Sequence, residues 1–199
     1  MIGQMWESAS QGLSQGTASR SPAELHSFLQ NAEIDPPYVL VGIFFGTLNV
    51  WVFASMYPDE VAGMVLVDGI HPDWEPRVLE YVTPDQQEGF MRFINSNSDK
   101  IDILENNLLV KDTGPFGDMP LAVLSRSKPP SNFKRYYGID IEEEAALHLE
   151  KIWQELQAEL ADLSSQSTHM NLNSDFELIE GQPELIRDTI MDIVEKAGR

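Results

Sequence analysis

The chain has 199 residues, 13 basic and 32 acidic side chains, a formal net charge of −19 at pH 7, and no cysteine. This length is sufficient for one domain with a full hydrophobic core. The charge argues against nucleic-acid binding, which needs Lys and Arg to contact phosphates, and against binding to anionic membrane surfaces. The absence of cysteine excludes disulfides, thiolate nucleophiles and Cys-ligated zinc.

The first 20 residues are rich in Gly, Ser and Gln and show no hydrophobic period. This composition predicts a flexible segment over 1–20, followed by one domain over 21–199. No basic stretch leads into an apolar core there, so we expect no signal peptide. We expect a soluble protein, and the sequence leaves its compartment open.

A helix is predicted directly after the flexible segment. Ser21 followed by Pro and Glu is typical of a helix start, because Ser caps the first turn and Glu completes a capping box. The helix is expected to end near Asn31 and to bury Leu25, Phe28 and Leu29.

An uncharged run from Tyr38 to Tyr57 is about one bilayer long. We nevertheless favour a strand over 37–42 and a helix over 46–56, because β-branched and aromatic residues fill the first half and a glycine turn divides the run. A second apolar strand is expected over 61–67. Continuous apolar strands indicate a parallel sheet covered on both faces, so the predicted fold class is α/β.

Residues 70–118 are predicted to form a helical insertion between two strands of the same sheet, with helices beginning at Thr83 and Ser98. Acidic residues outnumber basic ones heavily from Asp140 onward, and a solvated helical face is favoured there over an acidic docking surface. The remaining predicted elements are a strand over 119–124, a helix over 140–163, a strand over 168–172 and a helix over 183–197.

The turn between the first strand and the next helix has the layout of a nucleophile elbow. Such an elbow follows Gly-x-Ser-x-Gly, with the serine at the sharp turn. Both glycines are present, at Gly42 and Gly46, but Phe44 stands at the central position. A benzyl side chain cannot attack a carbonyl carbon, so the motif lacks its reactive hydroxyl.

Taken with its flanking strands, this chain resembles the α/β-hydrolase family. Residues 37–73 are similar to the family's nucleophile strand, elbow, helix and next strand, and residues 153–186 are similar to its C-terminal segment. The insertion over 70–118 lies where the family places its lid. The resemblance implies a mostly parallel sheet flanked by helices, with the family's N-terminal strands missing ahead of residue 37 and, with them, one donor of the oxyanion hole.

The family's catalytic positions are altered. The family elbow reads Gly-His-Ser-x-Gly-Gly, whereas this chain has Ile43, Phe44 and Thr47 at three of those positions. The family's catalytic histidine precedes a Gln-Pro-Glu-Leu segment, and Phe176 stands at that position. His169 is interpreted as a structural or exposed residue of the preceding strand.

The triad acid has two candidate positions. Asp68 ends the second predicted strand and is the possible residual acid, although a turn-capping role is favoured. The loop after Leu124 supplies no carboxylate. Glu144 and His148, four residues apart on a helix, make a weak case for a metal, and no cofactor or metal site is predicted.

Two functional hypotheses follow. A third possibility is a decayed gene fragment, which would also explain the altered catalytic positions and the missing N-terminal strands. The first is a catalytically inactive binding or structural subunit, with a protein partner covering the open strand edge Tyr38–Val41 and the back of the following helix, including an exposed Trp51. The second is a family enzyme, or an apolar-ligand binder, acting on a small ester-like molecule through a non-standard site. The residues expected to line that apolar site are Ile43, Phe44, Phe45, Phe90, Phe93 and Phe176.

Overall fold

The structure is a computed structural model that describes residues 22–95, 109–110, 113–130, 132–174 and 181–198. A four-stranded sheet in the order β1-β2-β3-β4 forms its centre, and every neighbouring pair is parallel. The strands are β1 Tyr38–Ile43, β2 Val61–Val67, β3 Leu121–Arg126 and β4 Ser167–Leu172.

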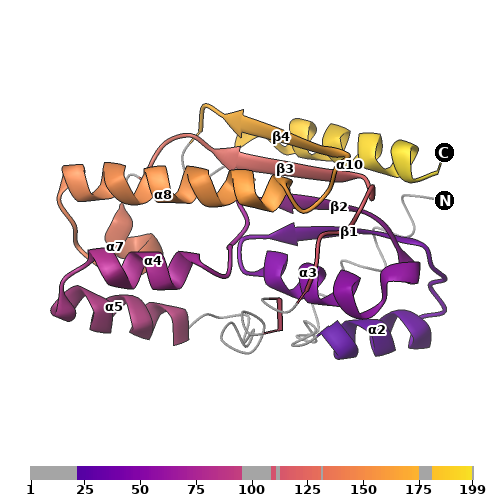
Figure 1. The fold of residues 1–199 in the computed structure, drawn as a ribbon, viewed down its shortest axis with the longest axis horizontal. Helices are drawn as coiled ribbons and strands as arrows, with labels where there is room; N and C mark the ends of the chain where they lie inside the picture. The colour runs from indigo at the N-terminus through magenta and orange to yellow at the C-terminus, as the bar shows by residue number, and fades with distance from the viewer. Residues whose placement is uncertain (1–21, 96–108, 111–112, 131, 175–180, 199) are drawn as a thin grey trace.

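Helices connect consecutive strands, as parallel pairing requires. The helices are α2 Pro22–Asn31, α3 Gly46–Met56, α4 Trp74–Tyr81, α5 Pro84–Asn95, α7 Phe133–Tyr137, α8 Glu143–Ala161 and α10 Pro183–Ala197, with a short 3-10 turn η1 at Pro58–Glu60. In Figure 1, α4, α5 and α7 gather at the end of the molecule toward which the strands point.

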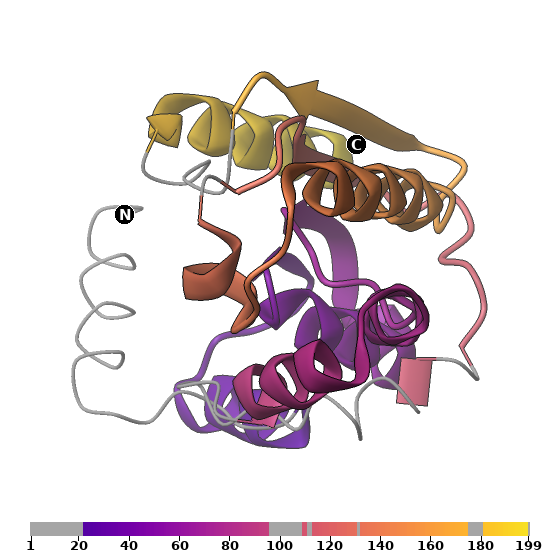
Figure 2. The same ribbon diagram turned by 90° about the vertical axis from the view of Figure 1, so that its left-hand side faces the viewer.

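The two faces of the sheet carry separate hydrophobic clusters. Met64 and Leu66 of β2 belong to the larger cluster, which the side chains of α3 and α8 complete. Val65 and Val67 alternate with them and pack with residues of α10 on the opposite face. Figure 2 shows α10 and α8 on different sides of the strands. The predicted α/β fold class, a parallel sheet flanked by helices, is therefore confirmed.

Most predicted elements lie within three residues of their observed bounds, and β2 and α3 match theirs. β3 differs from its predicted bounds, because it begins two residues later than predicted and extends to Arg126. α4 and α7 were not predicted, because short helices give little periodic signal. The helix predicted from Ser98 lies mostly outside the described residues.

Two predictions about single side chains were wrong. Phe28 is 48% exposed, because α2 packs on α3 through Leu25 and Leu29 instead. Trp51 is buried rather than exposed, since its indole Nε1 donates a 2.8 Å hydrogen bond to Thr113 Oγ1. The back of α3 therefore offers no free Trp51 surface to a partner.

β1 lies at one edge of the sheet. Within the described residues it pairs only with β2, from Tyr38 opposite Val61 to Ile43 opposite Val67. Val41 is 36% exposed and Ile43 is 41% exposed, whereas Leu40 is buried. The strand thus leaves apolar side chains and one row of backbone hydrogen-bonding groups without a neighbouring strand in the part of the chain that the structure describes.

Among the described residues, none of the helices combines the length and the apolar character needed to cross a bilayer.

Candidate functional site

The turn from β1 into α3 keeps the backbone of a nucleophile elbow. Phe44 has φ 48°, in the left-handed region that residues other than glycine rarely adopt. Its amide donates to the carbonyl of Val67 at 3.1 Å, and its own carbonyl accepts from the amide of Ile70 at 3.1 Å. These bonds tie the turn to the end of β2 and hold residue 44 in its strained conformation.

Gly42 allows the helix to approach the strand at this turn. A Cβ added to Gly42 would lie 2.6 Å from Cγ2 of Val50 and 2.8 Å from the Cα of Thr47. Real Cβ contacts are essentially never that short, so the position requires glycine. The second motif glycine, Gly46, has open space around the equivalent position and is not sterically required.

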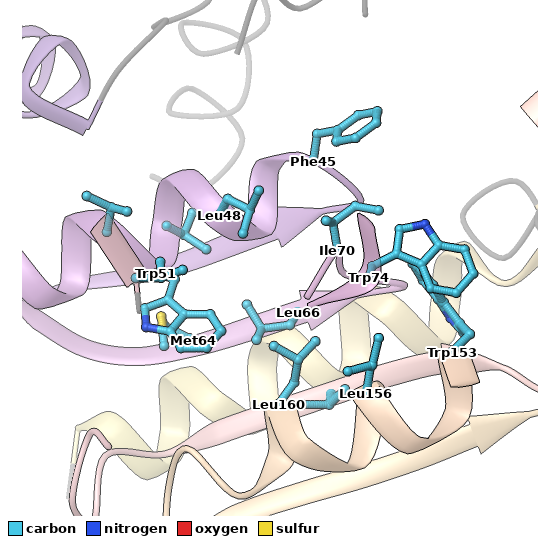
Figure 3. Close-up of a cluster of buried hydrophobic side chains, with 14 of the residues drawn as sticks. Phe45, Leu48, Trp51, Met64, Leu66, Ile70, Trp74, Trp153, Leu156 and Leu160 are labelled. Atoms are coloured by element: carbon cyan, nitrogen blue, oxygen red, sulfur yellow. The ribbon is translucent and has the colours of Figure 1, made fainter. Parts of the chain in front are cut away.

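The Phe44 ring packs into a group of aromatic side chains. Its centroid lies 4.5 Å from that of Phe45 and 6.2 Å from that of Trp153, and Phe45 lies 6.3 Å from Phe93. Phe90 is fully buried in the same core. Figure 3 shows the buried layer, with Trp74 and Trp153 at one end and Trp51 at the other.

Two of the residues predicted to line an apolar site cannot be counted with these aromatic side chains. Ile43 is among the exposed large hydrophobic residues. Phe176, predicted at the position of the catalytic base, lies outside the described residues. The structure therefore brings Phe44, Phe45 and Phe93 together by ring packing, with Phe90 buried nearby in the same cluster.

A buried ionic cluster stands at the carboxyl ends of β2 and β3. Arg126 is completely buried, and its guanidinium donates to Asp68 Oδ2 at 2.7 Å, to Glu150 Oε2 at 3.2 Å and to the hydroxyl of Tyr137 at 2.8 Å. The guanidinium carbon also lies 4.1 Å from the ring centroid of Trp153. Four residues, from the end of β2, from α7 and from α8, therefore surround the Arg126 cation of β3.

Asp68 accepts three hydrogen bonds in this cluster. Besides Nη1 of Arg126, the backbone amide of Arg126 donates at 3.3 Å and the indole of Trp153 donates at 3.1 Å. Asp68 also has a left-handed φ of 47°. None of these three donors is a histidine, whereas a triad acid accepts a hydrogen bond from the catalytic histidine.

Burial shifts the titration of the groups around Arg126. It raises the pKa of Glu150 above its ordinary value, although the nearby Arg126 charge acts in the opposite direction. It also raises the pKa of Tyr137, so the phenol stays neutral. Burial alone would lower the pKa of Arg126, but Tyr137, Asp68 and Glu150 outweigh it and the pKa is raised. The guanidinium therefore remains charged.

His169 has a partner that the sequence did not indicate. The Ser125 hydroxyl lies 2.8 Å from Nε2 of His169, across the pairing of β3 with β4. Burial lowers the pKa of His169, which favours the neutral imidazole. The pair has the distance of a nucleophile and its base, but Ser125 is fully buried and gives a substrate no access.

One group of side chains has metal-ligand composition. His71, Asp73 and Glu159 place ligand atoms within 4.8 Å of one another. The arrangement suits a hydrogen-bonded group better than a metal, because His71 Nδ1 accepts from the amide of Asp73 and the neutral ring then carries its proton on Nε2. Glu159 also forms an ion pair with Arg77, with 2.8 Å between Oε1 and Nη2. The weaker candidate, His148, stacks on Tyr81 at 4.2 Å.

The Arg126 cluster could not be predicted from the sequence, because its members lie far apart in the chain. Arg126 itself stands in a Ser-Arg-Ser-Lys segment that resembles a loop. The detectable signal was in the helix: Glu150, Trp153 and Gln157 are spaced three or four residues apart on α8, and all three are buried. That spacing places a carboxylate on the face that packs against the sheet.

Comparison with known proteins identifies the architecture. No family model matches the chain. The uncharacterized protein YqjL of Bacillus subtilis is 24% identical over 179 residues, which is 89% of this chain, and the chain spans 64% of that relative's length.

Solved structures give the same picture at lower identity. Mouse α/β hydrolase domain-containing protein 10 superposes with a TM-score of 0.56 at 15% identity, over 91% of this chain and 72% of its own. A probable hydrolytic enzyme from Pseudomonas aeruginosa superposes with a TM-score of 0.55 at 13% identity, over 89% and 70%. A thermophilic esterase from Thermogutta terrifontis gives 0.50 at 15% identity, over 88% and 71%. The parallel sheet, the elbow turn and these superpositions together establish that this chain has the α/β-hydrolase fold.

Proposed function

We propose that this chain is a catalytically inactive α/β-hydrolase-fold protein that acts as a binding subunit. The observation that carries the proposal is the elbow itself. Its strained turn is kept at Phe44, but the side chain there packs on Phe45 and Trp153 and has no nucleophilic atom. The scaffold of a hydrolase is thus retained with an apolar ring where the attacking oxygen belongs.

The Arg126 cluster supports the same conclusion. In a catalytic triad the acid holds the histidine in the correct tautomer and stabilises its charged form. Asp68 instead pairs with Arg126 and accepts from Trp153. A serine restored at residue 44 and a histidine restored at residue 176 would therefore still leave Asp68, the possible acid, paired with Arg126.

The partner in this proposal covers the β1 edge. Parallel sheets are normally buried on both faces, and exposed edges invite pairing with another chain. Val41 and Ile43 are exposed beside α10, which contacts β1. A polypeptide that adds a strand along Tyr38–Ile43 would bind by main-chain hydrogen bonds and cover both side chains. The helices between β2 and β3 would then serve as a lid without catalytic function.

The alternative is an enzyme that acts on a small ester-like molecule through a non-standard site. The 2.8 Å contact between Ser125 and His169 favours it, because this is the distance at which a base activates a hydroxyl. Proteins of this fold include a thermophilic esterase. The burial of Ser125 weighs against this alternative.

A fluorophosphonate probe and one double variant separate the two proposals. We expect no stoichiometric labelling of the parent chain, and no esterase activity from Phe44→Ser combined with Phe176→His, because Asp68 stays paired with Arg126. Labelling that maps to Ser125 and disappears in His169→Ala would establish the alternative. Restored esterase activity in the double variant would show an intact site and contradict the role assigned to Asp68.

The binding proposal has its own test in the association state of the purified chain. With an uncovered edge, we expect concentration-dependent self-association in sedimentation velocity, and we expect Val41→Lys and Ile43→Lys each to reduce it, since a charge at an exposed edge position blocks pairing. Phe28→Lys, at an exposed apolar position on α2 away from the β1 edge, serves as the control and should leave association unchanged. A compact, stable monomer at all concentrations would count against a missing partner.

A further inference from the structure

A cavity of about 500 Å³ lies at the end of the sheet where β2 begins, whereas the elbow lies at the other end. It is bounded by the last turn of α3, the first residue of β2 and the segment that leads into β3. Strand β2 begins at Val61 and the elbow follows the end of β1, so the whole length of the sheet separates the two places. The lining residues are Ala54, Ser55, Pro58, Val61, Thr113, Gly114, Pro115, Phe116 and Met119.

The outer wall of this cavity, residues 113–119, is fixed at several points. Thr113 Oγ1 accepts from the indole of Trp51 at 2.8 Å, and the amide of Phe116 donates to the carbonyl of Leu163 at 2.7 Å. The Trp51 and Phe116 rings meet edge to face at 6.4 Å. The carbonyl of Gly117 accepts from the amide of Ser165 at 2.9 Å. The cavity is therefore bounded by anchored backbone on its outer side.

The charge of the lining differs from that of the molecule. None of the nine lining residues that the structure describes is charged, although the chain carries a net charge of −19. A charged ligand entering this space would lose hydration without gaining a counter-ion from the lining. Apolar side chains and polar groups share the lining, which suits a neutral ligand that has both a hydrocarbon body and a polar group.

The two hydroxyl groups of the lining define the polarity of that ligand. Ser55 donates its only hydroxyl hydrogen to the carbonyl of Trp51 at 3.0 Å. Thr113 donates its own to the carbonyl of Val110 at 2.7 Å. A hydroxyl has one hydrogen and two lone pairs, so each of these groups can offer a ligand only an acceptor. A ligand must bring the donor.

We propose that this cavity binds a neutral molecule with a hydrocarbon body and an alcohol or amide hydrogen-bond donor, held by the acceptor oxygens of Ser55 and Thr113. The site is separate from the elbow and the β1 edge, so it stands whether or not the binding-subunit proposal holds. It also differs from an apolar site beside Phe44, because its lining shares no residue with that aromatic group.

The test compares cyclohexanol with cyclohexyl methyl ether, which has a similar body but no donor. The full chain, labelled with ¹⁵N, is titrated with each compound while the indole N–H signal of Trp51 is followed, since that indole binds the lining residue Thr113. We expect a saturable shift with the alcohol and about fivefold weaker binding of the ether, the effect of one neutral hydrogen bond. Cyclohexane carboxylate should not bind.

Two serine variants provide a matched pair. Ser55→Ala removes an acceptor from the cavity, whereas Ser27→Ala removes the same kind of hydroxyl on α2, where Ser27 bonds the carbonyl four residues earlier at 2.9 Å. Ser55→Ala should narrow the advantage of the alcohol, and Ser27→Ala should leave it unchanged. An unsaturable alcohol response, equal binding of the ether, or a full advantage kept in Ser55→Ala would overturn the proposal.

Discussion

At the scale of single residues, close packing and backbone hydrogen bonds hold the elbow turn. Phe44 holds φ 48°, a left-handed conformation that costs an L-residue roughly 1–2 kcal/mol. The strain persists because Gly42 lets α3 pack close to β1 and because the turn is hydrogen-bonded to Val67 and Ile70. The sharp turn therefore forms with a phenylalanine at its centre.

The two motif glycines should respond oppositely to alanine. Gly42→Ala places a methyl group 2.6 Å from Val50, so we expect a loss of about 1–3 kcal/mol in the free energy of unfolding. Gly46→Ala meets open space in the first turn of α3, so it should be neutral or stabilise by up to about 1 kcal/mol. Urea unfolding of both variants measures the contrast, and equal losses would show that close approach at Gly42 does not hold the turn.

Arg126 should be the most sensitive charged residue among those described. Arg126→Met leaves Asp68 and Glu150 buried without their cation, which typically costs about 3–5 kcal/mol. Arg77→Met removes a half-exposed partner of Glu155 and Glu159 and should cost no more than about 1 kcal/mol. Thermal unfolding followed by circular dichroism compares the two.

The triple variant Arg126→Met, Asp68→Asn, Glu150→Gln provides the control for this prediction. It removes the unpaired charges together with the cation, so much of the lost stability should return. An Arg126→Met protein as stable as the Arg77→Met protein would mean that the cluster does not support the fold.

At the scale of elements, β1 combines a buried face and an exposed one. Leu40 packs in the main core, while the adjacent Val41 is exposed on the other side of the strand. Leu40→Ala should destabilise by about 2–5 kcal/mol, and Val41→Ala by less than about 1 kcal/mol. The comparison is made by chemical unfolding at a fixed low concentration of the isolated chain. A large loss at Val41 would indicate that this face is already covered in the isolated protein.

The elements show which features the sequence could predict. β1, β2 and α3 are continuous apolar segments bounded by Pro and Gly, so local pattern alone located them within about one residue. β3 was placed two residues too early, because its end contains Ser125 and Arg126, which are polar by type and buried by tertiary contact. The same limit explains the site: the Phe44 substitution is visible in a motif, whereas the Arg126 cluster depends on partners from β2, α7 and α8 that no local pattern connects.

At the scale of the whole molecule, the Arg126 cluster joins the sheet to the helices beyond its carboxyl end. Asp68 follows β2, Arg126 ends β3, Tyr137 ends α7 and Glu150 lies on α8. Gln154 extends the chain of bonds, donating to Glu150 at 2.7 Å and accepting from Asn171 of β4 at 2.5 Å. One network, buried around Arg126 and exposed at Asn171, therefore links three of the four strands, so its ionisation affects the stability of the whole fold.

That network gives the molecule a pH dependence with a definite sign. Burial raises the pKa of Glu150 above its ordinary value of 4.5, so the folded state binds this proton more tightly than the unfolded state. The contribution of Glu150 to stability is then fully present below pH 4.5 and is lost as the pH rises through the raised pKa. Glu150→Gln removes this titration and keeps an acceptor for Arg126. The free energy of unfolding of the variant, minus that of the parent, should therefore increase as the pH rises from about 4.5 and then become constant.

Urea unfolding at a series of pH values and constant ionic strength measures the difference. Constant salt is needed because the net charge of −19 adds a general repulsion that also changes with pH. A difference that falls as the pH rises would mean that the attraction of Arg126 outweighs burial and that Glu150 is ionised more readily in the folded protein than in the unfolded chain.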